Sequence, residues 1–219
     1  GHSVGELAAA AISGAIGDED ALRLVRARGI EMAKAAALSP AGMSAVLGGD
    51  REVVLKKLEE LKLVAANDNG GGQIVAAGDL AALAALSENP PEGARVRALA
   101  VAGAFHTSFM EPAVEPLRTL AATIQTAPTT ISVISNKDGE VVSDGGEVLT
   151  RIVNQIANPV RWDLCMQTLK NLGVTGVIEL PPAGTLVGLL KRGAPEIETF
   201  ALKSADDLSA AKEFAGRHA

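Results

Sequence analysis

The sequence predicts an α/β fold in which a small α+β domain interrupts a larger α/β domain. Three observations lead to this prediction. The chain opens on a Gly-x-Ser-x-Gly pattern at residues 1–5, and an Ala-rich, helix-favouring run follows at once. Residues 41–103 alternate short apolar strands with helices in the order β-α-β-β-α-β. Residues 174–180 form a continuous apolar strand, the kind that parallel sheets bury on both faces.

The composition narrows the class of protein. The chain has 219 residues, enough for one large or two modest domains, and 47% of them are hydrophobic. Tyrosine is absent and aromatic residues make up 2%, so the core must be built from Ala, Val, Leu, Ile and Gly. A net charge of −6, without a basic run or an aromatic platform, argues against nucleic-acid binding. No apolar run approaches ~18 uncharged residues, so we expect no transmembrane helix.

The single cysteine, Cys165, excludes an intramolecular disulfide and a multi-cysteine zinc site. We therefore expect no metal, and a reducing, cytoplasmic location. Cys165 lies beside Leu164 and Met166 in a helical pattern, so we expect it in the core and not as a nucleophile.

The first five residues match the nucleophile elbow, in which a strand ends, the backbone turns sharply and a helix begins. We expect Gly1 and Gly5 to be required because neighbouring backbone passes too close for a β-carbon. The turn would expose the Ser3 hydroxyl and aim the Val4 N–H at a developing oxyanion. The alternative is a Gly-Ser-Gly turn without chemistry. Because an elbow needs a strand before it, we also expect a segment ahead of Gly1.

A long helix is predicted from about Glu19 to about Leu38, with Asp18 as its N-cap. At ~100° per residue, Arg28 falls in the middle of the apolar stripe of this helix. The other members of the stripe are Ala21, Leu24, Val25, Met32 and Ala35. An arginine on a buried face is unfavourable unless an anion meets it. Arg28 either snorkels or pairs with a structural carboxylate, or it presents a fixed guanidinium to a substrate carboxylate.

The small domain is predicted at residues 41–103, and the large domain at residues 1–40 and 104–219. Strands of the small domain are expected at 43–47, 63–66, 73–77 and 95–101. Its two helices should begin after the capping residues Asp50 and Asp79. This is the order of the ferredoxin-like split unit.

The rest of the large domain is predicted to alternate helices and strands. Its first helix should be broken near Pro112 and Pro116. The later elements are expected as a strand at 131–134, helices at 146–156 and 162–173, a strand at 174–180, a helix ending near 192, a strand at 200–202 and a closing helix.

Three histidines could serve as the general base for Ser3. His2 adjoins the serine, and its side chain should point elsewhere, whereas His218 lies at an end that we expect to be frayed. His106 remains, at the junction between the two domains, where sites commonly form; the alternative is a histidine without a function. No acidic residue is a compelling third member, since Glu6 is too near Ser3 along the helix. A backbone carbonyl can orient the imidazole instead.

Four motifs resemble those of a known family. They are residues 1–6, GHSVGE; the Arg28-Gly29 pair; residues 103–106, GAFH; and residues 155–162, QIANPVRW. Together they look like malonyl-CoA:acyl-carrier-protein transacylases, specifically the actinobacterial kind, and the resemblance covers the whole chain. It implies a hydrolase-like α/β large domain with a parallel sheet core, interrupted by a ferredoxin-like α+β small domain. This agrees with the order of elements above.

The resemblance implies a role for each matched residue. Ser3 would be the acylated nucleophile, with His106 as its general base and later acid. The backbone carbonyl of Gln155 would orient His106, and the Val4 N–H would be one oxyanion donor. Arg28 would bind the malonyl carboxylate.

Two further positions would bind substrate, at or near the pocket, by the same resemblance. Asn69 matches a family asparagine, although its loop reads Asn-Gly-Gly-Gly-Gln and lacks the family's frequent Ser-Pro. Phe105 would narrow the pocket against an α-methyl group and so favour malonyl over methylmalonyl. The family's second oxyanion donor is a glutamine in an N-terminal Gly-Gln-Gly loop, which this sequence does not contain. We therefore expect this part of the family's chain ahead of Gly1.

The resemblance implies ping-pong transfer of a malonyl group from malonyl-CoA to the phosphopantetheine thiol of acyl carrier protein, through a malonyl-serine. The reaction would supply extender units for fatty acid and polyketide synthesis. The two substrates would be malonyl-CoA and phosphopantetheinylated acyl carrier protein, with no permanently bound cofactor. We expect no nucleic-acid or membrane partner, and a cytoplasmic monomer.

Three other functions stay open at this point. An acyltransferase domain of a polyketide synthase shares the chemistry and motifs, although the ending shortly after Phe214 favours a free-standing enzyme. A serine esterase of the α/β-hydrolase kind predicts an acidic triad member and rapid hydrolysis of the acyl-serine. A non-catalytic module that binds a carrier protein is the third. Without the first strands of the sheet, we expect that residues 1–219 alone neither fold nor turn over.

Overall fold

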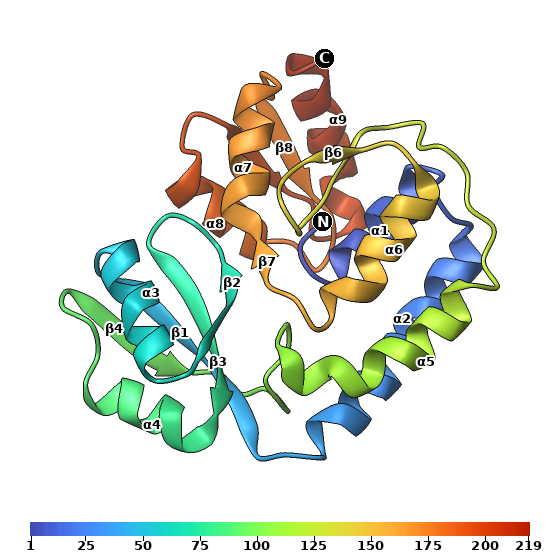
Figure 1. Ribbon diagram of the computed structural model, residues 1–219. Coiled ribbons are helices and arrows are strands. Elements are labelled where there is room, and N and C mark those ends of the chain that lie inside the picture. The colour runs from blue at the N-terminus through green and yellow to red at the C-terminus, as the bar shows by residue number, and fades with distance from the viewer.

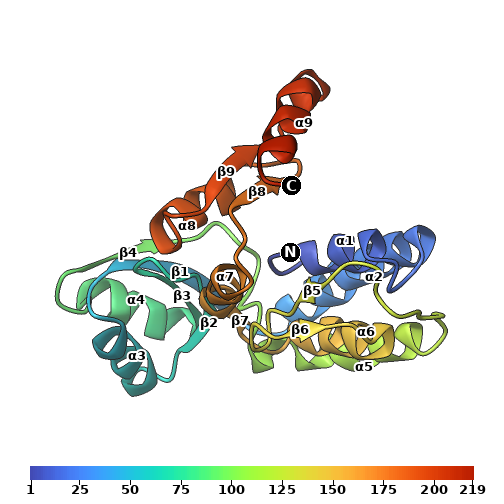
Figure 2. The same ribbon diagram turned by 90° about the horizontal axis from the view of Figure 1, so that it is seen from above.

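The computed structural model describes all residues, 1–219. Figure 1 shows three groups of elements: a sheet with helices beside it, a layer of helices, and a C-terminal arm. Seen from above, the arm stands out from the other two groups (Figure 2). No helix combines the length and the apolar character that crossing a membrane requires.

The sheet with two helices is built from residues 41–98. Its strands are β1 (Ala41–Gly48), β2 (Val64–Asp68), β3 (Gln73–Asp79) and β4 (Ala94–Ala98), and its helices are α3 (Arg51–Glu60) and α4 (Leu80–Glu88). The strand order is β4-β1-β3-β2, with every neighbouring pair antiparallel. The predicted β-α-β-β-α-β order is therefore confirmed. Asp50 and Asp79 cap α3 and α4 as predicted, because each side chain accepts from two backbone N–H groups.

The two faces of this sheet pack against different parts of the molecule, because alternate residues of a strand point to opposite sides. Val46 and Ile74 pack with Leu58 of α3 and Leu86 of α4 in one apolar cluster. The neighbouring residues on the strands, which include Met43 and Val75, form a second cluster around Ala104 with Phe105 and Phe109 against it. The second face therefore supports the segment on either side of His106.

The four-helix layer consists of α1 (Gly5–Ile12), α2 (Asp18–Ala36), α5 (Glu111–Ala121) and α6 (Gly145–Gln155). Helix α2 packs against both α1 and α5, and α6 packs against α1 and α5. Two apolar clusters fill the layer, one around Leu7 and Leu24 and the other around Met32 and Met110. The layer thereby holds the start of α1, the middle of α2 and the end of α6 close together.

The remaining elements connect the groups and form the arm. They are the 3-10 turn Ser108–Met110, the hairpin β5 (Val133–Ile134) and β6 (Val141–Val142), β7 (Val160–Arg161), α7 (Trp162–Asn171), β8 (Gly176–Glu179), α8 (Thr185–Gly193), β9 (Glu198–Ala201), the 3-10 turn Ala205–Asp207 and α9 (Leu208–Arg217). Strand β7 joins the edge of the sheet in parallel with β2, and β8 pairs in parallel with β9.

Two local expectations about helices were wrong. Asp18 is the first residue of α2 and not its cap, and the capping position, Gly17, makes no side-chain bond. Helix α5 runs unbroken from Glu111 to Ala121, through both prolines. Pro112 fits because it lies in the first turn, where N–H groups have no helical partner. The buried face of α5 against α2 compensates for the one hydrogen bond that Pro116 cannot make.

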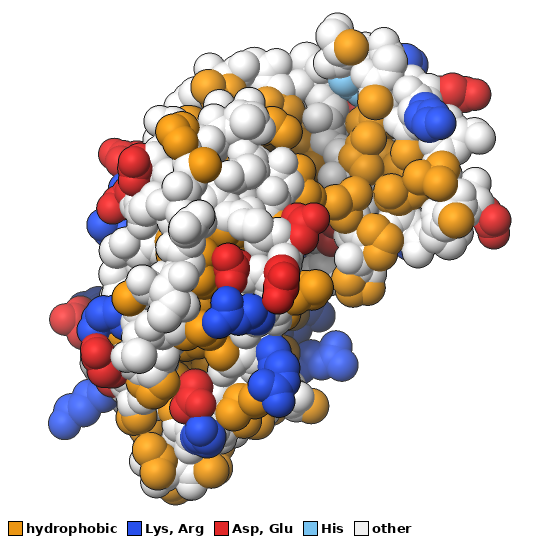
Figure 3. Space-filling view, turned by 90° about the vertical axis from the view of Figure 1, so that its right-hand side faces the viewer, with side chains coloured by type: hydrophobic (Ala, Val, Ile, Leu, Met, Phe, Trp, Pro, Cys, Tyr) orange, Lys and Arg blue, Asp and Glu red, His pale blue; other side chains and the backbone are white.

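Strand β8 also differs from the prediction of a strand buried on both faces. All four of its residues are half-buried, because it pairs with β9 alone and α9 packs against it. Figure 3 shows hydrophobic side chains gathered on the arm, beside a hollow that separates it from the rest of the molecule. The parallel sheet expected in this part of the chain is limited to the β8–β9 pair.

Candidate active site

The elbow has a strained backbone at its centre. Ser3 has φ of 52°, in the left-handed region, two residues before the first residue of α1. For a residue other than glycine this conformation costs about 1–3 kcal/mol, so surrounding contacts must hold it. A β-carbon on Gly1 would lie 2.1 Å from the backbone of Gly5, so glycine is required there. Gly5 has open space around it, and the expectation that it is equally constrained was wrong.

His106 lies against the serine hydroxyl. Its Nε2 is 2.8 Å from Ser3 Oγ, and its Nδ1 is 2.9 Å from the backbone oxygen of Gln155. A carbonyl oxygen can only accept, so Nδ1 carries the proton and Nε2 is free to accept from the serine. A third contact, from the His106 N–H to the Ile156 oxygen, holds the backbone at φ of 62°. The end of α6 therefore positions both the ring and the backbone of the histidine.

The surroundings of His106 keep it neutral. The residue is 4% exposed, and burial lowers the pKa of its imidazole to about 4, with the nearby Arg28 charge adding to the shift. The hydrogen bond to Gln155 opposes this shift without reversing it. At neutral pH the ring can accept a proton from the serine.

Arg28 reaches the same serine from α2. Its Nη2 donates to Ser3 Oγ at 3.0 Å and to Gln155 Oε1 at 3.5 Å. Burial lowers the pKa of the guanidinium to about 10, which leaves it charged at neutral pH. No carboxylate forms an ion pair with it within 4.0 Å. The Glu6 charge raises the pKa of the guanidinium in opposition to burial, while the Glu6 carboxyl bonds to Asn136 and Gln155. The apolar members of the α2 stripe are buried as predicted except Val25, which is exposed, and Arg28 itself is half-buried.

A cavity of about 210 Å³ opens beside these groups. Its lining is Ser3, Arg28, Gly29, Met32, Ala33, Ala102, Phe105 and His106. The polar part of this lining is the serine hydroxyl with the guanidinium and the imidazole that contact it. The other residues are apolar or small, and Phe105 is the largest of them.

The Val4 N–H is available at the mouth of the elbow. It makes no hydrogen bond, whereas the N–H groups of Ser3, Gly5 and Glu6 each have a partner. Val4 is the residue before the first turn of α1, where N–H groups point away from the helix and the helix dipole favours negative charge. This N–H can stabilise an oxyanion formed next to Ser3.

The other two histidines lie apart from the serine hydroxyl. His2 Nε2 is 2.8 Å from Asn69 Oδ1, and its ring packs against Trp162, so the side chain points away from Ser3 Oγ as predicted. Asn69 is buried and contacts His2, and it does not line the cavity. The expectation of a frayed His218 was wrong, since its ring contacts Thr175 and Glu198.

Sequence reasoning missed a buried polar group behind the elbow, made of Glu6, Asn136 and the side chain of Gln155. Glu6 accepts from the Asn136 N–H at 2.7 Å and from Gln155 Nε2. Burial raises the pKa of the Glu6 carboxyl. Asn136 lies in an Asn-Lys-Asp-Gly stretch that is typical of a turn, and this sequence gives no sign that its side chain is buried. For Glu6, the one signal in the sequence was its closeness to Ser3 along the chain. That closeness served only to exclude Glu6 as a member of a catalytic triad.

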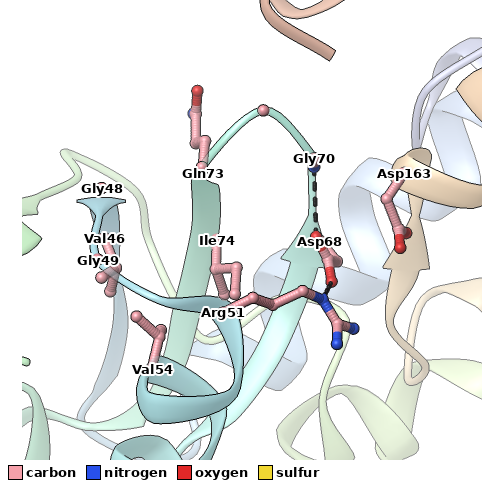
Figure 4. A pocket seen from close by; sticks show the side chains of 12 residues that line it. Val46, Gly48, Gly49, Arg51, Val54, Asp68, Gly70, Gln73, Ile74 and Asp163 are labelled. Carbon is pink, nitrogen blue, oxygen red and sulfur yellow. Dashed lines mark hydrogen bonds and ion pairs between the residues drawn. The ribbon is translucent and has the colours of Figure 1, made fainter. Parts of the chain in front are cut away.

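A second pocket lies in the sheet with two helices, away from the serine. Figure 4 shows it between the β1–α3 turn and the β2–β3 loop, with Asp163 of α7 facing it. Arg51 and Asp68 form an ion pair of 2.8 Å across its floor. Every charged group on it is paired with a neighbour, since Asp163 binds Arg161. No group of three or more His, Cys, Asp or Glu side chains could hold a metal ion anywhere in the molecule.

Comparisons with known proteins bear on this arrangement. A family model described as acyl transferase domain matches residues 1–213. The malonyl CoA-acyl carrier protein transacylase of Mycobacterium tuberculosis is 54% identical over 208 residues, which are 95% of this chain and 69% of that protein.

Solved structures agree with the sequence comparison. The crystal structure of MCAT from Mycobacterium tuberculosis has a TM-score of 0.93 at 54% identity, covering 96% of this chain and 70% of that one. A malonyl-transacylase solved in complex with its type II PKS acyl-carrier protein has a TM-score of 0.89 at 28% identity, covering 97% and 71%. The chain that holds the serine, histidine and arginine described above is therefore similar in both sequence and fold to malonyl CoA-acyl carrier protein transacylases.

Proposed function

The chain belongs to the malonyl-CoA:acyl-carrier-protein transacylases, and we propose how its own residues carry out that reaction. Its activity is [acyl-carrier-protein] S-malonyltransferase, EC 2.3.1.39, an acyltransferase reaction of fatty acid biosynthesis. The observation that carries the mechanism is that the imidazole and the guanidinium both contact the serine hydroxyl oxygen. His106 Nε2 and Arg28 Nη2 lie 2.8 Å and 3.0 Å from Ser3 Oγ.

The first half-reaction begins when the malonyl carboxylate pairs with Arg28. The guanidinium has no carboxylate partner of its own, and a planar fork of N–H groups can bind a carboxylate in bidentate fashion. This contact sets the thioester carbonyl beside Ser3 Oγ. Arg28 is therefore the specificity group for acyl chains that end in a carboxylate.

The chemistry then proceeds by four proton transfers to or from His106, two in each half-reaction. As Ser3 Oγ bonds to the thioester carbon, its proton moves to His106 Nε2, and the Val4 N–H stabilises the oxyanion. The C–S bond breaks, and the CoA sulfur takes the proton from Nε2. The phosphopantetheine thiol of the carrier protein next gives its proton to Nε2 and attacks the malonyl ester. The C–O bond breaks, and the proton returns to Ser3 Oγ.

Gln155 acts in this scheme through its backbone. Its carbonyl oxygen accepts from His106 Nδ1 at 2.9 Å, which keeps Nε2 directed at the serine in both half-reactions. An esterase triad would place a carboxylate at this position. The neutral carbonyl found here supports transfer over an esterase mechanism.

Several finer features are part of the proposal. Phe105 limits the width of the cavity and so favours malonyl over methylmalonyl, and Asn69 supports the pocket by holding His2. Acyl carrier protein is the partner, by analogy with the malonyl-transacylase solved with its acyl-carrier protein. The protein works as a cytoplasmic monomer and has no resident cofactor. Its products also supply polyketide synthesis.

The domain division is proposed as well. Residues 41–103 form a ferredoxin-like small domain, supported by the strand order β4-β1-β3-β2. Residues 1–40 and 104–219 belong to a hydrolase-like large domain with a parallel sheet, supported by the β8–β9 pair and by the elbow.

The test uses the complete natural polypeptide with Ser3→Ala. Intact-protein mass spectrometry after brief exposure to malonyl-CoA should show a malonyl adduct on the parent and none on the variant, because the attacking oxygen is gone. Ser13→Ala at the other end of α1 is the matched control and should acylate like the parent. A malonyl adduct on the Ser3→Ala protein would contradict the assignment.

A further inference from the structure

We propose that Asn136 is the positioning residue that sets the Ser3 nucleophile in its reactive conformation. The proposal rests on the function given above, in which Ser3 is acylated. Asn136 is fully buried, at 0% exposure, and it does not line the substrate cavity. Its effect on the reaction must therefore pass through its contacts with the elbow.

The side chain of Asn136 bridges the two ends of the strained turn. Its Oδ1 accepts from the Ser3 N–H at 2.7 Å, and its Nδ2 donates to the Gly1 oxygen at 2.8 Å. Both are backbone contacts that flank the left-handed residue, Ser3, whose φ is 52°. The amide orientation follows from chemistry, since an N–H only donates and a carbonyl oxygen only accepts.

Among side chains of this size, a carboxamide makes this bridge at neutral pH without taking up a proton. It offers a donor and an acceptor on one rigid plane, matched to one backbone acceptor and one backbone donor. A carboxylate would set an anionic oxygen against the Gly1 carbonyl and near Glu6. An apolar residue would leave the Ser3 N–H buried and unpaired, which favours a different turn.

Asn136 is itself fixed from its backbone and its side chain. Its backbone N–H donates to the Glu6 carboxyl group at 2.7 Å, and its backbone oxygen accepts from the Arg161 N–H at 2.7 Å. Gln155 Nε2 approaches the same Oδ1 at 3.2 Å and also the Ser3 oxygen at 3.2 Å.

Gln155 thus connects the positions of the nucleophile and the base. The Gln155 carbonyl orients His106, while the Gln155 side chain joins Asn136 and Ser3. Asn136 holds the serine at a fixed place relative to the imidazole that Gln155 holds. Displacements of about 1 Å in such an arrangement cost about 10²-fold in rate.

The test measures single-turnover acylation by malonyl-CoA in the complete natural polypeptide carrying Asn136→Ala. We expect the acylation rate constant to fall about 100-fold, because the serine is no longer held against the base. The half-saturating malonyl-CoA concentration should stay that of the parent, since the Arg28 contact is intact. Ser13→Ala, which removes a buried hydroxyl at the far end of α1, controls for general loss of stability.

A second variant, Asn136→Asp, separates positioning from folding. A protonated carboxyl group restores a donor and an acceptor, whereas the carboxylate offers acceptors only. The ratio of variant to parent acylation rate should therefore rise as the pH is lowered from 8 toward 5, a trend that a merely structural role would not produce. This ratio decides the matter if Asn136→Ala fails to fold.

Three results would overturn the proposal. They are a parent-like acylation rate in Asn136→Ala, a loss confined to malonyl-CoA binding, and a pH-independent ratio in Asn136→Asp. A parent protein that forms no malonyl-serine would instead refute the proposed function, so the two failures are distinguishable.

Discussion

The sheet with two helices and the assembly around Ser3 differ in how far along the chain their partners lie. Strands β1 to β4 and helices α3 and α4 all come from residues 41–98 and are joined by short turns. Ser3, by contrast, bonds to His106, 103 residues away, and to Asn136, 133 residues away. The sheet is held by an apolar core, and the elbow by polar contacts among buried groups.

This difference separates two kinds of sensitivity. An apolar core tolerates a lost contact by a loss of stability that depends on volume. A catalytic group held by hydrogen bonds loses rate when its direction changes, with or without a change in stability. Substitutions near Ser3 should therefore change rate constants, and those in the sheet should change unfolding.

The largest effect is expected from His106→Ala. Loss of the general base should lower the acylation rate constant by about 10²–10⁴-fold. Rapid-quench measurement with malonyl-CoA checks this, and His218→Ala is the matched control because His218 lies on the arm. A parent-like rate in the His106 variant would mean that another group takes the serine proton.

The pH dependence of acylation by the parent protein also tests His106 as the general base. Only the neutral imidazole accepts a proton, and the pKa of His106 is lowered to about 4. The acylation rate of the parent should therefore stay level from pH 8 to about pH 5 and fall through about pH 4. A fall centred near pH 6.5, the ordinary histidine value, would show that burial does not shift this group.

A smaller and selective effect is expected from Arg28→Ala. Removing one partner of a buried charge pair costs about 2–5 kcal/mol, so malonyl transfer should fall by about 30-fold or more. Acetyl transfer should change far less, because an acetyl group has no carboxylate. Comparing kcat/KM for malonyl-CoA and acetyl-CoA checks this, with Arg23→Ala on the exposed side of α2 as control. Equal losses for both acyl groups would reject the role of Arg28.

The sheet provides the opposite case in Leu58→Ala. Leu58 is 1% exposed in the core between the sheet and its helices, and its truncation should destabilise the protein by about 2–5 kcal/mol. The acylation rate of the folded variant should stay near that of the parent. Chemical denaturation and rapid quench together check this, with the half-exposed Leu80→Ala as control. A large rate loss with unchanged stability would erase the contrast between the two regions.

The smallest effect is expected from Gly5→Ala, within the elbow itself. A β-carbon there meets no atom within 4 Å, and alanine favours the helix by up to about 1 kcal/mol. Acylation should be unchanged and the unfolding midpoint equal or slightly higher. Gly1→Ala is the matched contrast, because its β-carbon would lie 2.1 Å from backbone atoms and must displace the turn. Similar behaviour of the two variants would contradict this geometry.

The same contrast explains how much the sequence could predict. The β-α-β-β-α-β order followed from local patterns, since each strand and its neighbours are close in the chain. Ser3 and Arg28 could be found from local sequence. Ser3 lies in a Gly-x-Ser-x-Gly motif, and Arg28 is a charged residue on an otherwise apolar helix stripe. His106 was reached by elimination among three histidines.

The remaining features depend on contacts that no local pattern records. Asn136 sits in a turn sequence, and its function comes from a backbone N–H 133 residues earlier. Gly5 matches a motif position whose steric reason is absent here. The half-buried state of β8 depends on which elements lie beside it, and the continuous apolar run alone predicted full burial.

The single cysteine gives the region behind the elbow a built-in reporter. Cys165 is 1% exposed, and its Sγ lies 3.3 Å from the Ser135 oxygen and 3.6 Å from Asn136 Nδ2. Burial raises the pKa of its thiol to about 12, so the protein with Cys165 buried has almost no reactive thiolate at neutral pH. Any labelling by a thiol reagent must then pass through transient opening of the packing beneath the nucleophile. The labelling rate of the unmodified protein measures how often that opening occurs.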